Sequence, residues 1–329
     1  MKKFIKISDN LLNIRILVTS YPFCYKDKSP LKMLQKAGFY VDNSVMELKR
    51  KLTKEELLEK IKDFDAVIAG TEKYDAEILD RAPKLKIISR LGIGLDSIDF
   101  SEIKKRNIAV AYTPAAPSRA VAELVIGLMI VLSRRVYNVD KNLRNGKWTR
   151  TVGLDISEKK IGIIGLGRIG KLVAQFLQPY GCDILVNDIQ PDYKFIKKYK
   201  LKSSTKNEIY RNADIITLHI PKTEKTNNLI SAKQLRQMKK NCILINTSRG
   251  GIINEADLCC HLKNNKEFFS GIDVFENEPY SGELCKLENI ILTPHLGSCS
   301  ENSRYLMESG AAQNIIDFFS CVKNKNIIR

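Results

Sequence analysis

The chain has 329 residues, of which 44% are hydrophobic and 28% are charged, ordinary values for a globular protein with room for two domains. No apolar run approaches the roughly 20 residues needed to cross a bilayer, and residues 1–6 lack the hydrophobic core of a secretory signal. These features exclude a membrane-spanning protein and predict a cytoplasmic one.

The net charge of +17 could indicate a nucleic-acid or membrane-surface partner, because Lys and Arg neutralise phosphates. The lysines are instead dispersed along amphipathic helical patterns, which favours solvated helix faces that help to attract an anionic substrate and cofactor. We therefore expect no nucleic-acid and no membrane partner. The eight cysteines are scattered without a CxxC pair, so we interpret them as reduced, mostly buried thiols, and we expect no metal site.

In the first third of the chain, short apolar runs alternate with helical patterns. Strands are predicted at 14–19, 65–70, 85–90 and 108–112. Helices are predicted to begin at Ser29, which is followed by a first-turn proline, and after Thr53, which starts a capping box. This alternation predicts an α/β domain.

A second α/β series follows the proline-bounded segment 113–117, beginning with a long apolar helix over 118–137. Strands are predicted at 161–165, 183–187, 214–220, 242–246, 270–274 and 290–293. The last helical pattern, 303–321, has no strand of its own beside this sheet, so we expect it to return to the first domain. The predicted architecture is a Rossmann-type doubly wound parallel sheet domain (114–296) inserted into a flavodoxin-like α/β substrate-binding domain (1–113 and 297–329).

A glycine run marks the centre of the second series. Gly165 permits a tight turn, Gly167 lets the backbone approach a pyrophosphate, and Gly170 lets the helix that begins at Arg168 pack on the strand. The following strand ends at Asp188, where an acid binds ribose hydroxyls and repels a 2′-phosphate. The pattern therefore predicts NAD, rather than NADP, as the cofactor.

Side chains that could take part in catalysis follow successive strands of the same predicted sheet. Arg249 precedes a glycine pair, Glu278 precedes a proline, and His295 lies between a proline and a glycine. His219 also ends a strand and is expected to line the cofactor. Because carboxyl ends of parallel strands meet at one edge, we expect Arg249, Glu278 and His295 to converge where a nicotinamide would lie.

Five segments in order, GLGRIG, LHIPKTEKTNNLI, LINTSRGGIINEADL, GIDVFENEP and TPHLGS, resemble the D-isomer specific 2-hydroxyacid dehydrogenase family, in particular its D-3-phosphoglycerate dehydrogenases. The resemblance covers nearly the whole chain. It implies that Arg249 binds substrate, that His295 is the acid/base and that Glu278 is its partner. It also implies a substrate-binding loop at 90–99, in which Arg90, Gly92, Ile93 and Gly94 hold the substrate carboxylate.

Further cofactor contacts are expected from residues around the glycine run and at the strand ends. These are Arg168, Ile169, Pro221, Thr226, Thr247 and Asp273, the last of which is implied by the resemblance to bond the nicotinamide amide. The nearly all-apolar helix over 118–137 predicts deep burial or a shared subunit face, and we expect a homodimer through this domain.

The first expectation for the substrate is 3-phosphoglycerate, oxidised to 3-phosphohydroxypyruvate in serine biosynthesis. Two departures weaken it: segment 113–118 lacks the asparagine that many family members carry, and strand 65–70 lacks an arginine that some phosphoglycerate dehydrogenases have. The alternatives are a glyoxylate/hydroxypyruvate reductase or a dehydrogenase for another D-2-hydroxy acid. From a different class, an NAD-sensing corepressor could share this fold.

Overall fold

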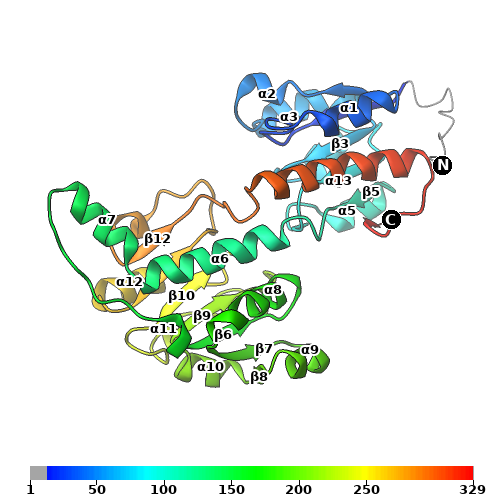
Figure 1. Cartoon of the computed structure of the whole chain (residues 1–329). Helices are drawn as coiled ribbons and strands as arrows, with labels where there is room; N and C mark the ends of the chain where they lie inside the picture. The colour runs from blue at the N-terminus through cyan, green and yellow to red at the C-terminus, as the bar shows by residue number, and fades with distance from the viewer. Residues whose placement is uncertain (1–12, 329) are drawn as a thin grey trace. The chain divides into compact units, whose positions relative to one another are not determined.

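The structure is a computed structural model that describes residues 13–328, and the expectation about a secretory signal at residues 1–6 lies outside the described residues. The described residues form two compact units (Figure 1). The first holds the residues up to Pro117 together with those from Cys299 onward, and the second is Ser118–Ser298. The predicted domain boundaries, 113/114 and 296/297, lie within four residues of these limits.

The sheet of the first unit has six strands in the order β13-β5-β4-β3-β1-β2. Their bounds are β1 Arg15–Val18, β2 Tyr40–Asp42, β3 Ala66–Ala69, β4 Ile87–Arg90, β5 Ala109–Ala111 and β13 Ile327–Ile328. All pair in parallel except β13, which is antiparallel to β5. The chain winds in opposite directions from β1 and β3, the flavodoxin-like order predicted from the sequence.

Helices cover both faces of this sheet. They are α1 Ser29–Lys36, α2 Val45–Leu48, α3 Lys54–Lys60, α4 Ala76–Asp80, α5 Phe100–Lys105 and α13 Glu301–Phe319. The predicted capping box begins α3, because Thr53 Oγ1 accepts the Glu56 amide and the Glu56 carboxylate accepts the Thr53 amide. The last helix, α13, packs against α1, β4 and β3.

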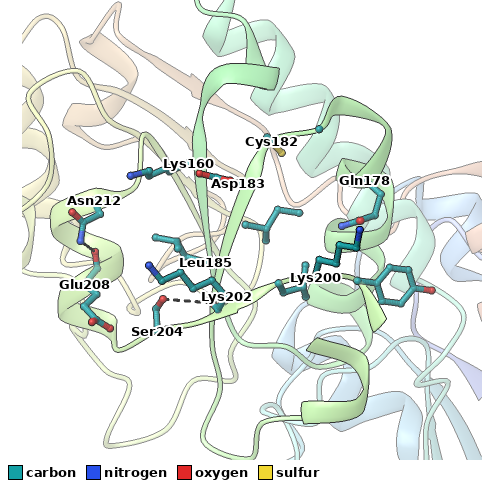
Figure 2. A pocket seen from close by; sticks show the side chains of 14 residues that line it. Lys160, Gln178, Cys182, Asp183, Leu185, Lys200, Lys202, Ser204, Glu208 and Asn212 are labelled. Carbon is teal, nitrogen blue, oxygen red and sulfur yellow. Dashed lines mark hydrogen bonds between the residues drawn. The ribbon is translucent and has the colours of Figure 1, made fainter. Parts of the chain in front are cut away.

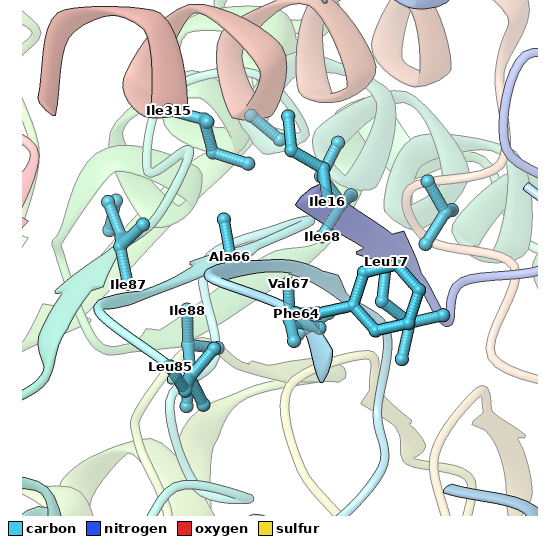
Figure 3. Packing of buried hydrophobic residues seen from close by; sticks show 14 of the residues in the cluster. Ile16, Leu17, Phe64, Ala66, Val67, Ile68, Leu85, Ile87, Ile88 and Ile315 are labelled. Carbon is cyan, nitrogen blue, oxygen red and sulfur yellow. The ribbon is translucent and has the colours of Figure 1, made fainter. Parts of the chain in front are cut away.

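The core of the first unit follows from strand alternation. Ala66 and Ile87 point toward Ile315 of α13, whereas Val67 and Ile88 point to the opposite face (Figure 3). Because both faces are buried, β3 is a continuous apolar run, and β4 begins with Ile87 and Ile88 before the buried Ser89.

The second unit has a seven-stranded, fully parallel sheet in the order β12-β11-β10-β9-β6-β7-β8. The strands are β6 Lys160–Ile164, β7 Asp183–Asn187, β8 Lys202–Ser203, β9 Ile215–Leu218, β10 Ile243–Asn246, β11 Phe269–Ile272 and β12 Ile290–Leu292. The direction of winding reverses between β6 and β9, where doubly wound sheets bind their ligands. The predicted Rossmann-type architecture is confirmed.

The helices of the second unit include one departure from prediction. They are α6 Ser118–Ser133, α7 Val136–Arg144, α8 Arg168–Leu177, α9 Tyr193–Lys198, α10 Lys206–Asn212, α11 Ala232–Leu235 and α12 Glu255–Asn264. The single helix predicted over 118–137 is divided, because Arg135 adopts a left-handed conformation with φ +52° between α6 and α7. One side of α6 packs on α8, β10 and β11.

Two general properties complete the fold. No helix within residues 13–328 is long and apolar enough to cross a membrane. The interpretation of the cysteines as mostly buried was wrong, since only Cys24, Cys242 and Cys259 are buried. Four others are exposed, because they lie on outer helix faces or in loops.

Candidate active site

The predicted site residues of the second unit lie at the carboxyl ends of its strands. Gly165 follows β6, Asp188 follows β7, His219 follows β9 and Thr247 follows β10. Asp273 likewise follows β11, and His295 lies three residues beyond β12. Since all seven strands are parallel, these positions share one edge of the sheet, as the sequence predicted.

The glycine loop leaves room at the start of α8. Gly165 has φ +99°, and a Cβ there would lie 2.3 Å from the His219 carbonyl oxygen. A Cβ on Gly170 would lie 2.0 Å from the Gly165 carbonyl oxygen, whereas a Cβ on Gly167 would meet no atom within 4 Å. Gly167 caps α8 without a side-chain hydrogen bond. The loop therefore combines open space with the amide donors of a helix N-terminus, which suits a phosphate.

Asp188 ties the glycine loop to the end of β7. Its Oδ2 accepts the Leu166 amide at 2.6 Å and its Oδ1 accepts the Gln190 amide at 2.8 Å. Each carboxylate oxygen can accept a further hydrogen bond, so these contacts are compatible with the predicted ribose contact.

At the same edge of the sheet, two enclosed polar atoms have no hydrogen-bond partner among residues 13–328, namely His219 Nδ1 and Thr247 Oγ1. His219 Nε2 pairs with Thr217 Oγ1 at 3.0 Å, and burial lowers the pKa of His219 to about 3, so the ring is neutral. Because enclosed polar groups are normally satisfied, the orphaned atoms indicate a polar ligand at this edge. With the glycine loop, the residues present fit a dinucleotide.

Pro221 and Thr226, which were predicted to contact the cofactor, lie in the loop after β9 and form hydrogen bonds within it. Thr226 Oγ1 donates to the Pro221 carbonyl oxygen at 2.7 Å and accepts the Thr223 amide at 2.7 Å. These bonds fix the shape of segment 221–226.

Within residues 13–328, no cluster of three or more His, Cys, Asp or Glu side chains could hold a metal ion.

The predicted contact between His295 and Glu278 is present. His295 Nδ1 lies 2.9 Å from Glu278 Oε2 and 3.2 Å from Oε1, and both side chains are partly exposed. The Phe275 amide donates to Glu278 Oε1 at 3.1 Å and orients the carboxylate. A carboxylate on Nδ1 holds the proton of the neutral ring there, which leaves Nε2 as the nitrogen that can exchange a proton.

Arg249 lies on a loop that packs against the segment carrying Glu278. Its Nη1 donates to the Ser248 carbonyl oxygen at 2.7 Å, and its own carbonyl oxygen accepts from Asn246 Nδ2 at 2.9 Å. A Cβ on Gly250 would lie only 1.9 Å from the Phe275 carbonyl oxygen. Glycine is therefore required where the Arg249 loop meets the Glu278 segment.

Asp273 braces the segment that carries His295. Its buried carboxylate accepts from Thr293 Oγ1 at 2.6 Å, from the Leu296 amide at 2.6 Å and from the Gly297 amide at 2.9 Å. Burial raises the pKa of Asp273, although these three donors oppose the rise. Asp273 was predicted to bond a nicotinamide amide. No local sequence pattern indicates its contacts with Thr293, Leu296 and Gly297, which lie 20 to 24 positions later in the chain.

The predicted substrate loop belongs to the first unit. Arg90 ends β4, and the next residues are held by Leu91 N to Ala69 O at 2.9 Å and Gly92 N to Thr113 Oγ1 at 2.9 Å. Gly92 has φ +133°, which favours glycine. Within the described part of the chain the amides of Ile93 and Gly94 donate no hydrogen bond, so both can bind a carboxylate.

A depression of about 380 Å³ lies away from these residues (Figure 2). It includes Lys160 and Asp183, the first residues of β6 and β7, and so lies toward the amino-terminal ends of the strands. Lys200, Lys202 and Glu208 are also part of its largely exposed wall. It contains none of the predicted site residues.

Comparison with known proteins agrees with this geometry. Residues 126–297 match the family described as D-isomer specific 2-hydroxyacid dehydrogenase, NAD binding domain. The glyoxylate reductase of Korarchaeum cryptofilum (strain OPF8) is 36% identical over 275 residues, which cover 81% of this chain and 83% of that protein.

Two proteins named for phosphoglycerate are also similar. The D-3-phosphoglycerate dehydrogenase of Methanocaldococcus jannaschii is 37% identical over 313 residues, which cover 92% of this chain but 57% of that longer protein. The NAD⁺-bound crystal structure of 3-phosphoglycerate dehydrogenase from Entamoeba histolytica matches with a TM-score of 0.80 and 28% identity, covering 96% of this chain and 99% of that one.

Proposed function

This chain belongs to the D-isomer specific 2-hydroxyacid dehydrogenase family and is an NAD-dependent oxidoreductase, and we propose that it reduces glyoxylate or hydroxypyruvate to the corresponding 2-hydroxy acid. Glyoxylate reductases are frequent among its similar relatives, including those of Thermococcus litoralis and Thermofilum pendens. The first expectation from the sequence, 3-phosphoglycerate, is therefore supported less well than its alternative.

The observation that carries the proposed chemistry is the 2.9 Å contact between His295 and Glu278. Glu278 stabilises the charge on a protonated imidazole, which can then give its Nε2 proton to the substrate carbonyl oxygen as the bond is reduced. In the oxidative direction the neutral ring accepts the hydroxyl proton. NADH, when bound, supplies the hydride.

Groups in each unit are proposed to bind a keto acid. In the first unit, the amides of Ile93 and Gly94 bind its carboxylate, because they belong to a glycine-rich loop and lack other acceptors within the described residues. In the second unit, Arg249 contributes a guanidinium, whose planar fork suits a carboxylate or a polarised carbonyl.

The end of β3 supports an unphosphorylated substrate. The strand ends at Ala69 and leads into Gly70, and the first charged residue after it is an acid, Glu72. Thr19 Oγ1 donates to Glu72 Oε2 at 3.1 Å, and the carboxylate lies over Gly70. A carboxylate next to the loop of β4 opposes a phosphate dianion by charge repulsion.

Phosphoglycerate oxidation is the second candidate. It is favoured by the 37% identity to the Methanocaldococcus jannaschii enzyme over 92% of this chain. Arg90 and Lys73 are the basic residues near the end of β3 that could contact a phosphate in this case.

A substrate panel separates the candidates. NADH oxidation is measured with glyoxylate, hydroxypyruvate, phosphohydroxypyruvate, pyruvate and 2-oxoglutarate, and the substrates are ranked by kcat/KM, which measures discrimination. We expect glyoxylate or hydroxypyruvate to rank first. A first rank for phosphohydroxypyruvate would establish the second candidate, and no turnover of any keto acid would favour the corepressor alternative.

We also propose a homodimer. The outer side of α6–α7 and the loop that follows expose large apolar residues, including Tyr137, Leu143, Trp148 and Val152. Trp148 is 78% exposed and Val152 is 93% exposed. An apolar surface of this kind on one element and its adjoining loop is typical of a subunit interface.

A further inference from the structure

Glu255 connects the two loops that carry Arg249 and Glu278. It is the first residue of α12, six positions after Arg249. Its Oε1 accepts the backbone amide of Glu276 at 2.6 Å, and Glu276 lies two positions before Glu278. This hydrogen bond is charge-assisted and therefore stronger than one between neutral groups.

The segment around Glu276 is held at several neighbouring points. The preceding amide, that of Phe275, donates to Glu278 Oε1 at 3.1 Å, so two successive amides are each held by a carboxylate. The ring of Phe275 stacks on Tyr280 with centroids 4.3 Å apart. Gly250 packs on the Phe275 carbonyl group from the opposite loop. Glu255 supplies the side-chain contact at Glu276.

The charge on Glu255 also lies near the acid/base pair. Burial raises the pKa of the Glu255 carboxyl, the Glu276 amide lowers it, the negative charges of Glu276 and Glu278 raise it, and Lys222 lowers it. Tyr280 is the other titratable group that faces it, and the charge on Glu255 raises the pKa of that phenol. Glu255 and Glu278 are thus close enough to influence each other electrostatically.

We propose that Glu255 is a positioning residue, which holds segment 275–278 through the Glu276 amide and so sets the contact between Glu278 and His295. The inference rests on the proposed acid/base role of His295. It assigns Glu255 no contact with substrate or cofactor. Its effect should therefore appear in turnover, while substrate and cofactor affinity stay unchanged.

Two substitutions separate the hydrogen bond from the charge. Glu255→Ala removes both, and we expect kcat to fall about 10- to 100-fold, because small misplacement of catalytic groups is costly. The KM for the keto acid and the Kd for NADH should change less than threefold. Glu255→Gln keeps an acceptor for the Glu276 amide, and we expect it to restore kcat to within about threefold of the unsubstituted protein.

The comparison of kcat with KM separates positioning from a purely structural role. A misplaced acid/base pair lowers kcat while KM stays in place, because the lost interaction acts in the transition state. A purely structural role would instead lower the midpoint of urea denaturation and leave the turnover of the folded fraction unchanged.

The matched control is Glu283→Gln. Glu283 is an exposed carboxylate on the same unit and pairs with Lys263 and Lys286. It should behave like the unsubstituted protein in every assay. If Glu255→Ala does not fold, Glu255→Gln still tests the proposal, because its kcat should stay within about threefold of the unsubstituted protein.

Two results would overturn the inference. One is a folded Glu255→Ala variant with unchanged kcat, and the other is a Glu255→Gln variant whose kcat falls as far as that of Glu255→Ala. If either occurs while His295→Ala is inactive, only the role of Glu255 fails. If His295→Ala itself keeps normal turnover, the proposed acid/base function fails.

Discussion

Asp273 holds His295 in a left-handed backbone conformation. The His295 amide donates to the Asp273 carbonyl oxygen at 2.9 Å, and the Asp273 carboxylate accepts the two amides that follow His295, those of Leu296 and Gly297. His295 has φ +56°, which costs a residue other than glycine roughly 1–2 kcal/mol. The end of β11 therefore determines where the imidazole at the end of β12 is placed.

Replacing Asp273 should reduce both stability and turnover. Asp273→Ala leaves two backbone amides and the Thr293 hydroxyl without their acceptor, so we expect the free energy of unfolding to fall by about 2 kcal/mol or more. Asp273→Asn keeps one acceptor oxygen and should lose less. Urea denaturation measures the change, and equal stability of Asp273→Ala and the unsubstituted protein would contradict this role.

His295→Ala tests the general acid directly. We expect kcat to fall by about 10²–10⁴, because positioned proton transfer contributes this much, while the Kd for NADH changes little. Stopped-flow or steady-state measurement of NADH oxidation gives kcat, and fluorescence titration gives the Kd for NADH. The control is His261→Ala on α12, whose ring packs edge-on against Phe268 and which should keep normal turnover. Comparable losses in both variants would argue against His295.

Gly167→Ala should separate folding from cofactor binding. A Cβ at Gly167 meets no protein atom within 4 Å, so the free energy of unfolding should change by less than about 1 kcal/mol. The same methyl group occupies space proposed for the pyrophosphate, and we expect the Kd for NADH to rise at least about tenfold. Gly127→Ala on α6, where a Cβ also meets nothing, is the control. Unchanged NADH affinity in Gly167→Ala would place the pyrophosphate elsewhere.

His219 should contribute to acid destabilisation. Its pKa is about 3 in the folded protein and about 6.5 in an unfolded chain, so between these values the unfolded chain binds one more proton. The free energy of unfolding should therefore fall as pH decreases from about 6.5, by up to about 1.4 kcal/mol per pH unit from this residue.

The measurement compares denaturation of the unsubstituted protein and His219→Gln at pH 7, 6 and 5. The substituted protein should show a shallower loss. Burial also lowers the pKa of His261, but that residue contributes equally to both proteins. Parallel curves would mean that His219 takes up its proton in the folded state.

Trp148 tests the proposed homodimer. It is the only tryptophan of the chain, so its fluorescence reports on this loop alone. Dilution from micromolar to nanomolar concentration should shift the emission to longer wavelength as the indole is exposed to water. Trp148→Ser with Val152→Ser should sediment as a monomer, whereas Val322→Ser, at an exposed position in the other unit, should not change the mass. A monomeric unsubstituted protein at micromolar concentration would contradict the proposal.

Features with local causes could be predicted from the sequence. These features are the glycine run, the capping box at Thr53 and the buried apolar strands, each of which depends on residues within one turn or one strand. The alternation of strands and helices predicted the α/β class, and the glycine run with Asp188 predicted NAD as cofactor. Strand β2 was missed because three half-exposed residues at a sheet edge show neither alternation nor an apolar run. The division of the long helix was missed because Arg135 is not a residue type that signals a left-handed break.

The sequence by itself determined the family, the architecture and the identity of the residues at the strand ends, because parallel strands bring their carboxyl ends to one edge wherever the intervening loops lie. Only the tertiary structure decided how those residues are supported. Asp273 meets Leu296 across 23 positions and Glu255 meets Glu276 across 21. Such contacts depend on the register of neighbouring strands and on loop packing, and no local spacing of residues encodes them.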